Sequence, residues 1–233
     1  MKSPSFIVFG FLLGVFVHAN QAQIFRKIKE LKINKSFTYI SERYGDYDPG
    51  MDKQFSKEDR DYFNSIAKQT EYNGPCPLAR WTSNVKIYVE GRKPTYLINE
   101  LNRIVEELNQ IIEPIDITLV ENKSESNYVI YLMSGNEYAR IEPAAVKNID
   151  TNWGLFVVNS GREIKKGSMY VDLDRCTSIA AQKHLLREEL TQSLGLKNDT
   201  YDYPESIFYQ NWTETTDYAP IDRRLIDMLY NYW

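Results

Sequence analysis

A short stretch near the C-terminal end of the chain decides how the rest of the sequence is interpreted: EELTQSLGLKN, residues 188–198. It closes a helical pattern that runs from about 178 to 194, in which Leu186, Leu190 and Leu194 fall on one face. Gly195 stands where a glycine commonly ends a helix. The stretch therefore predicts a helix that bears an unusual set of carboxylate and amide side chains and stops at Gly195.

The order of the other periodic segments predicts an α+β fold with a twisted mixed sheet. Residues 95–113 carry apolar side chains at helical spacing and predict a long helix that backs the sheet. A first helix over residues 57–72 is expected after Ser56, which has the character of an N-cap, and a C-terminal helix over 220–230. Strands are expected at residues 85–90, 115–120, 128–133, 155–158 and 169–173.

The N-terminal residues have the pattern of a secretory signal peptide. Lys2 precedes an uncharged apolar run at residues 6–17, and small residues at Ala19 and Ala22 offer two cleavage positions. We therefore divide the chain into a signal peptide at 1–19, a polar extension at 20–55 and a globular domain at 56–233. The expectation is a secreted or periplasmic protein with no membrane span after cleavage, since the apolar run is too short to cross a bilayer.

Charge and histidine content exclude several classes of function. The formal net charge of −4 leaves no basic surplus for a phosphate backbone, so nucleic acid is not an expected partner. Of the two histidines, signal cleavage would remove His18 and leave His184. A site that needs two histidines is therefore excluded from the exported chain. The sequence also has no phosphate-binding glycine loop and no Gly-x-Ser-x-Gly nucleophile elbow.

The two cysteines predict one disulfide. Cys76 and Cys176 form an even pair, and thiols in an oxidising compartment are commonly paired. The alternative is two buried thiols.

Three linked segments carry a resemblance to known families. Residues 188–198 have the spacing of the metzincin zinc motif, His-Glu-x-x-His-x-x-Gly-x-x-His, although the ligand types differ. Residues 204–209 resemble the Met-turn of those peptidases, and residues 219–231 resemble their closing helix. More closely, Arg80-Trp81, residues 188–196 and Asn198-Asp199 resemble the secreted bacterial proteins of the domain of unknown function 2927 family. The resemblance implies a zincin-like fold, in which an active-site-type helix lies below an edge strand that pairs with peptides.

The resemblance also implies roles for single residues. Glu188, Gln192 and Asn198 occupy the three metal-ligand positions, and Glu189 occupies the position of the general base. The residues that would support the site are Gly195, Asp199, Phe208 and Tyr209. Carboxylate and amide oxygens bind zinc far less well than imidazoles do, so an ordinary zinc site is not expected at the usual position.

Three other arrangements of these residues are open. His184 lies one turn before Glu188 and can share one ion with it. Glu188, Asn198, Asp199 and Asp202 can instead gather Ca²⁺ or another hard cation, which accepts such oxygens. Glu189 with Gln192 can in principle hydrolyse amides without a metal. The structural alternative is an amphipathic core helix with Glu188 and Glu189 facing water.

The sequence favours a degenerate member of a peptidase fold. The main hypothesis is a non-catalytic protein that binds an extended peptide or protein segment in a cleft beneath an edge strand, placed at residues 155–159. The alternative is an active metallopeptidase with a non-standard metal site and Glu189 as general base.

Overall fold

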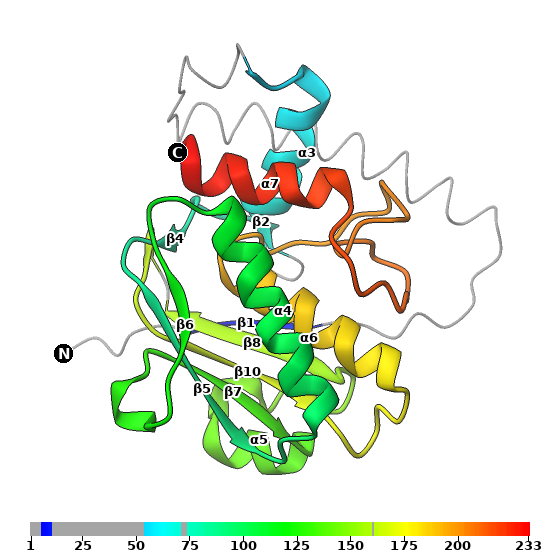
Figure 1. Cartoon of the computed structure of the whole chain (residues 1–233). Helices are drawn as coiled ribbons and strands as arrows, with labels where there is room; N and C mark the ends of the chain where they lie inside the picture. The colour runs from blue at the N-terminus through cyan, green and yellow to red at the C-terminus, as the bar shows by residue number, and fades with distance from the viewer. Residues whose placement is uncertain (1–5, 11–53, 71–73, 160) are drawn as a thin grey trace, which may run out of the picture.

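The computed structural model describes residues 6–10, 54–70, 74–159 and 161–233. Its centre is a sheet with the strand order β1-β8-β10-β7-β5-β6 (Figure 1). The bounds of these strands are β1 Phe6–Gly10, β5 Val85–Gly91, β6 Ile117–Leu119, β7 Tyr128–Met133, β8 Gly154–Asn159 and β10 Gly167–Asp172. The sheet is mixed: β10, β7, β5 and β6 run parallel to one another, whereas β8 runs antiparallel to β10 and to β1.

Helices cover both faces of the sheet. Helix α6 (Ile179–Ser193) packs on β8 and β10, and α4 (Thr95–Ile111) packs beside α6. Helix α3 (Lys57–Ala67) and the C-terminal helix α7 (Pro220–Asn231) contact each other beyond the end of α4 and α6 (Figure 1). Helix α5 (Gly135–Ile141) covers the opposite face, where it contacts β7 and β10.

Short elements connect these layers. Two two-stranded pairs join β2 (Gln69–Thr70) to β3 (Gly74–Pro75) and β4 (Arg80–Trp81) to β9 (Glu163–Ile164). Two 3-10 turns, η1 (Lys123–Glu125) and η2 (Pro143–Ala145), complete the described elements.

Two hydrophobic clusters hold the layers together. The larger one lies between the sheet and helices α3, α4, α6 and α7, and includes the fully buried Trp81, Leu190 and Leu229. The smaller one lies under α5, where Tyr138 stacks on Tyr170 with ring centroids 4.6 Å apart. The larger cluster therefore positions α6, the helix that carries the polar stretch.

The predicted elements are confirmed, with local differences. Ser56 caps the first helix through a capping box with Asp59, but the helix ends at Ala67 and the chain turns into β2. Helix α5 was not expected, because a single seven-residue helix shows too little of the helical period to be recognised. The mixed sheet, the long α4, the site helix α6 and the closing α7 follow the order that the zincin-like resemblance implies.

The predicted disulfide is wrong. Cys76 and Cys176 are both free and buried. Cys176 lies just before the first residue of α6, whereas Cys76 contacts Lys197, just after its last turn. A helix of 15 residues is about 22 Å long, and a disulfide needs Cα atoms about 4–7 Å apart. The length of α6 therefore separates the two thiols.

The expected open edge also differs. Residues 155–159 do form a strand, but β8 is flanked on its outer side by β1, which pairs with it from Phe6↔Asn159 to Gly10↔Leu155. Because β1 lies inside the predicted signal peptide, β8 becomes the edge strand only in a chain that has lost these residues.

Candidate functional site

Helix α6 is held at both ends by specific contacts. Ser178 accepts a hydrogen bond from the Ala181 amide and caps its N-terminus. At the C-terminal end, Trp81 Nε1 donates to the Ser193 carbonyl and Tyr230 Oη to the Leu194 carbonyl. Gly195 follows with φ +131°, as a C-terminal glycine should. These contacts fix the orientation of the side chains that α6 presents.

Glu188, at the first ligand position, is paired with His184. The Nε2 atom of His184 lies 3.2 Å from Glu188 Oε2, and both side chains are 1% exposed. The other ring nitrogen, Nδ1, is 2.7 Å from the Thr215 carbonyl oxygen. Burial alone would lower the pKa of His184, but the Glu188 carboxylate outweighs it, so the pKa is raised. The structure thus brings together the pair that was expected from their spacing of one helical turn.

The other two ligand positions also have protein partners. Gln192 Nε2 donates to Asp199 Oδ1 at 2.6 Å, and Asn198 Nδ2 donates to the Ser65 carbonyl of α3 at 2.9 Å. All of these side chains are buried. The first bond therefore holds the loop after α6 against α6 itself. The second holds the same loop against α3.

Glu189, at the position of the general base, points from α6 toward β8. A Cβ atom added to Gly154, the first residue of β8, would come within 2.8 Å of Glu189 Oε1. Glu189 is 1% exposed. Burial raises the pKa of Tyr128 well above its usual range, and the nearby Glu189 carboxylate adds to that rise. Glu189 thus lies beneath the sheet, as expected, and does not face water.

The segment expected to resemble a Met-turn packs beside the end of the motif. Thr200 and Tyr209 form an isolated parallel bridge, and the Thr200 amide donates to the Phe208 carbonyl at 3.0 Å. Phe208 is fully buried in the core, whereas Tyr209 is half-buried. Both residues therefore support the loop that contains Asn198 and Asp199.

The same segment is tied to α7 through a buried carboxyl. Asp222 accepts hydrogen bonds from Ser206 Oγ at 2.5 Å and from the amides of Ile207 and Ala219 at 3.2 and 2.9 Å. Burial raises the pKa of Asp222 to about 6, against the opposing effect of these donors.

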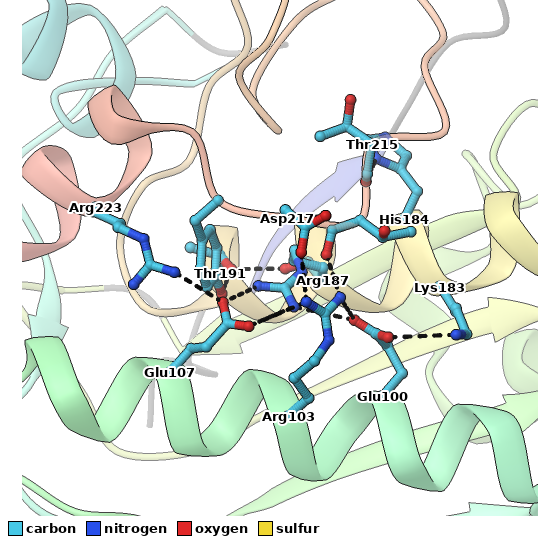
Figure 2. Close-up of polar contacts among 12 residues, drawn as sticks. Glu100, Arg103, Glu107, Lys183, His184, Arg187, Thr191, Thr215, Asp217 and Arg223 are labelled. Carbon is cyan, nitrogen blue, oxygen red and sulfur yellow. Dashed lines mark hydrogen bonds and ion pairs between the residues drawn. The ribbon is translucent and has the colours of Figure 1, made fainter.

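A buried network of charges links α6 to α4 (Figure 2). The Arg187 guanidinium, which is fully buried, donates to Glu107 Oε2 at 2.8 Å and to Glu100 Oε1 at 3.0 Å. Its Cζ lies 4.3 Å from the centre of the Tyr218 ring. Arg103 donates to the same Glu100 at 2.6 Å. This network sets the rotation of α6 about its axis and, with it, the direction of the neighbouring Glu188.

These contacts do not suit the zinc site that the resemblance suggests. The groups at the three positions are a carboxylate in ion-pair contact with His184 and two amides whose nitrogens donate within the protein, and none of the three is an imidazole. Asp202 is exposed, whereas Glu188 is buried, so the structure does not gather the four residues considered for Ca²⁺. Over the described ranges, no three His, Cys, Asp or Glu side chains form a metal-binding group.

Several residues of the site were not expected from the sequence. Ser65 and Thr215 contribute backbone carbonyls, which leave no signal in a sequence. Arg187 directly precedes the motif, but its partners Glu100 and Glu107 are 87 and 80 residues away. Only a tertiary structure identifies such pairs.

Comparisons with known proteins give one family and two distant structures. No curated protein matches the chain. Two solved structures of myroilysin are similar to it, with 14% and 13% identity and TM-scores of 0.40 and 0.41. They cover 65% and 72% of this chain and 82% and 92% of their own. The family described as protein of unknown function (DUF2927) matches residues 56–232, which include α6 and every side chain of the site described above. The chain therefore belongs to the DUF2927 family.

Proposed function

We propose that this protein is a non-catalytic peptide-binding protein, derived from a peptidase-like fold, that takes an extended segment of a peptide or protein beside β8. The observation that carries the proposal is the set of contacts that the side chains at the three ligand positions make within the protein. The Glu188 carboxylate lies in ion-pair contact with His184, and the amide nitrogens of Gln192 and Asn198 donate to Asp199 and to the Ser65 carbonyl. A hydrolytic metal needs free donors on the protein and one open position for water. The side chains at these positions instead hold the fold together.

The position of Glu189 supports the same conclusion. A general base must reach the water or substrate proton that it removes. Glu189 is 1% exposed and packs against Gly154. In this position it has no route to a substrate on the surface.

Strand addition is the binding mode that the sheet favours. The outer side of β8 accepts an extended segment in antiparallel register, because β1 occupies that place over five residue pairs. A strand edge offers a row of backbone donors and acceptors to any extended chain. If residues 1–19 are removed during export, the same row of groups becomes free for a ligand.

Export is part of the proposal. It is supported by the apolar run at residues 6–17 with small residues at Ala19 and Ala22. Within the part of the chain that the structure describes, no helix is both long enough and apolar enough to span a membrane. We place the protein outside the cytoplasm, in the periplasm or the medium.

A peptide library tests binding and cleavage together. The wild type, Glu189→Gln and Gln192→Ala are compared, with Glu106→Gln on the exposed side of α4 as the control. We expect binding without cleavage in the wild type. Cleavage that disappears in Glu189→Gln and persists in Glu106→Gln would identify a working general base and defeat the proposal.

The binding mode has its own test. Two forms of one bound peptide are made, with N-methyl groups on alternate residues of one edge or of the other edge. Only the form whose methyl groups face β8 should lose binding, because it alone removes donors from the new ladder. Equal loss or equal retention in the two forms would exclude strand addition.

A metal-dependent peptidase is the second candidate, and one observation favours it. His184 Nε2 and Glu188 Oε2 lie 3.2 Å apart, and Nδ1 contacts the Thr215 carbonyl, so Nε2 faces the carboxylate. Catalytic zinc sites commonly use three protein ligands, and this pair supplies two. Protein incubated with zinc and desalted should therefore retain well under one equivalent. One retained zinc, lost in His184→Ala, would favour the peptidase.

A further inference from the structure

Beside the site, two nucleophilic side chains meet in the protein interior. Lys197 Nζ lies 3.1 Å from Cys76 Sγ. Lys197 follows α6, between Gly195 and Asn198, whereas Cys76 follows β3, so the contact joins parts of the chain 121 residues apart. Neither residue has a role in the proposed binding of peptides.

The surroundings of Lys197 are unusual for a lysine. Its side chain is 3% exposed, and its second hydrogen bond goes to the uncharged Pro77 carbonyl at 3.1 Å. Within the described ranges it has no carboxylate partner. A buried ammonium group without a counter-charge costs several kcal/mol, on the order of the penalties found for buried ions. Its Nζ instead contacts the Cys76 sulfur, which places the two reactive side chains next to each other.

Cys176 provides an internal comparison. It is fully buried, whereas Cys76 is 8% exposed. Cys176 Sγ lies 4.0 Å from the Ser178 carbonyl oxygen, and among the described residues it has no amine as a hydrogen-bond partner. Burial raises the pKa of the Cys176 thiol to about 11, and the charges of Asp172 and Glu214 add to the rise. Since the thiolate is the reactive form, Cys176 is protected from oxidants.

We propose that Cys76 and Lys197 form an oxidation-dependent covalent cross-link, in which one oxygen atom bridges the sulfur and the nitrogen. The oxidant is a peroxide. The first equivalent oxidises the thiol to a sulfenic acid and is reduced to water. The second removes two electrons from the amine as the N–O bond forms, and the N–H and O–H hydrogens leave in two further waters. In sum, one thiol, one amine and two hydrogen peroxide molecules give one S–O–N bridge and three waters.

The geometry favours this product over the alternatives. A disulfide is excluded by the length of α6 between the cysteines. A direct sulfur–nitrogen bond would need the two atoms, now 3.1 Å apart, to approach to a single bond length, while Lys197 Nζ also donates to the Pro77 carbonyl. One inserted oxygen needs little movement of either side chain. The bond would tie the segment before β4 to the loop that holds Asn198 and Asp199.

Tryptic mapping of the full chain tests the proposal. Protein prepared with reduced thiols is treated with hydrogen peroxide and then digested. Trypsin cannot cleave after a modified Lys197, so the expected product joins peptide 69–80 to peptide 188–223. Its mass should equal the sum of the two peptides plus one oxygen and minus two hydrogens. Dithiothreitol should reduce the bridge and separate the two peptides, and trypsin should then cleave after Lys197 again.

Two variants complete the experiment. Cys176→Ser should form the linked peptide as the wild type does, whereas Lys197→Arg, which keeps the charge but not the primary amine, should not. In Lys197→Arg, Cys76 should instead proceed to the sulfinic or sulfonic acid. The proposal is overturned if wild-type Cys76 is oxidised without a linked peptide, or if it pairs with Cys176. The wild-type result decides this even if a variant does not fold.

Discussion

At the scale of single residues, Gly195 is a position at which the backbone requires glycine. It has φ +131°, and an added Cβ would lie 2.1 Å from the Ala79 carbonyl oxygen. Gly195→Ala should therefore lower the free energy of unfolding by about 3 kcal/mol or more, from backbone strain and from the clash together. Urea denaturation measures the change.

Gly161→Ala is the matched control for this change. Gly161 has a similar φ of +124°, but no atom lies within 4 Å of an added Cβ. Gly161→Ala should lower the free energy of unfolding only by the backbone strain, about 1 kcal/mol. If the two substitutions lower the free energy of unfolding equally, the clash with Ala79 does not contribute to the loss in Gly195→Ala.

Asp222 is the residue for which the structure predicts a dependence of stability on pH. Burial raises the pKa of Asp222 to about 6, above the value of about 4 in an unfolded chain. As the pH falls, the folded protein therefore binds this proton first. The contribution to stability is fully present below about pH 4 and is lost as the pH rises through about 6.

Asp222→Asn should remove this dependence: its one amide oxygen can still accept from the two backbone amides, while its NH2 group faces Ser206 Oγ. Relative to the variant, the wild type should lose up to about 3 kcal/mol of unfolding free energy between about pH 4 and pH 6. Chemical denaturation across that range checks it. If the free energy of unfolding changes with pH in the same way in the two proteins, Asp222 is not the source of the pH dependence.

At the scale of elements, the charge network decides how α6 packs on α4. Arg187→Met would leave Glu100 and Glu107 with one cation fewer in a buried place, and should cost about 3–5 kcal/mol. Arg103→Met is the comparison, because Arg103 shares Glu100 but is 37% exposed, and should cost about 1 kcal/mol or less. If both substitutions lower the free energy of unfolding by a similar amount, burial of the guanidinium does not explain the loss in Arg187→Met.

At the scale of the whole molecule, the proposed peptide ligand would compete with β1 for one edge of the sheet. A chain without residues 1–19 should bind a fluorescent peptide with the β1 sequence, FIVFG, at least about tenfold more tightly than the full chain, because the tethered β1 has a high effective concentration. Fluorescence anisotropy measures the affinities, and circular dichroism checks that both chains are folded. Equal affinities would place the peptide somewhere other than β8.

Much of the architecture was predictable from the sequence, because helices and strands depend on short-range patterns. The spacing of Leu186, Leu190 and Leu194 predicted α6, and Gly195 predicted its end. Apolar alternation predicted β5 and helical spacing predicted α4, each to within a few residues. The His184–Glu188 pair was also predictable, since its two members lie one turn apart on the same helix.

What only the tertiary structure decided is which groups those elements bring together. Asn198 bonds to Ser65 across 133 residues, and Lys197 bonds to Cys76 across 121. The predicted disulfide failed for the same reason, because an even number of cysteines carries no information about the length of helix between them. The sequence by itself determined the elements and the types of side chain at the motif. Their partners depend on long-range packing, which local patterns do not encode.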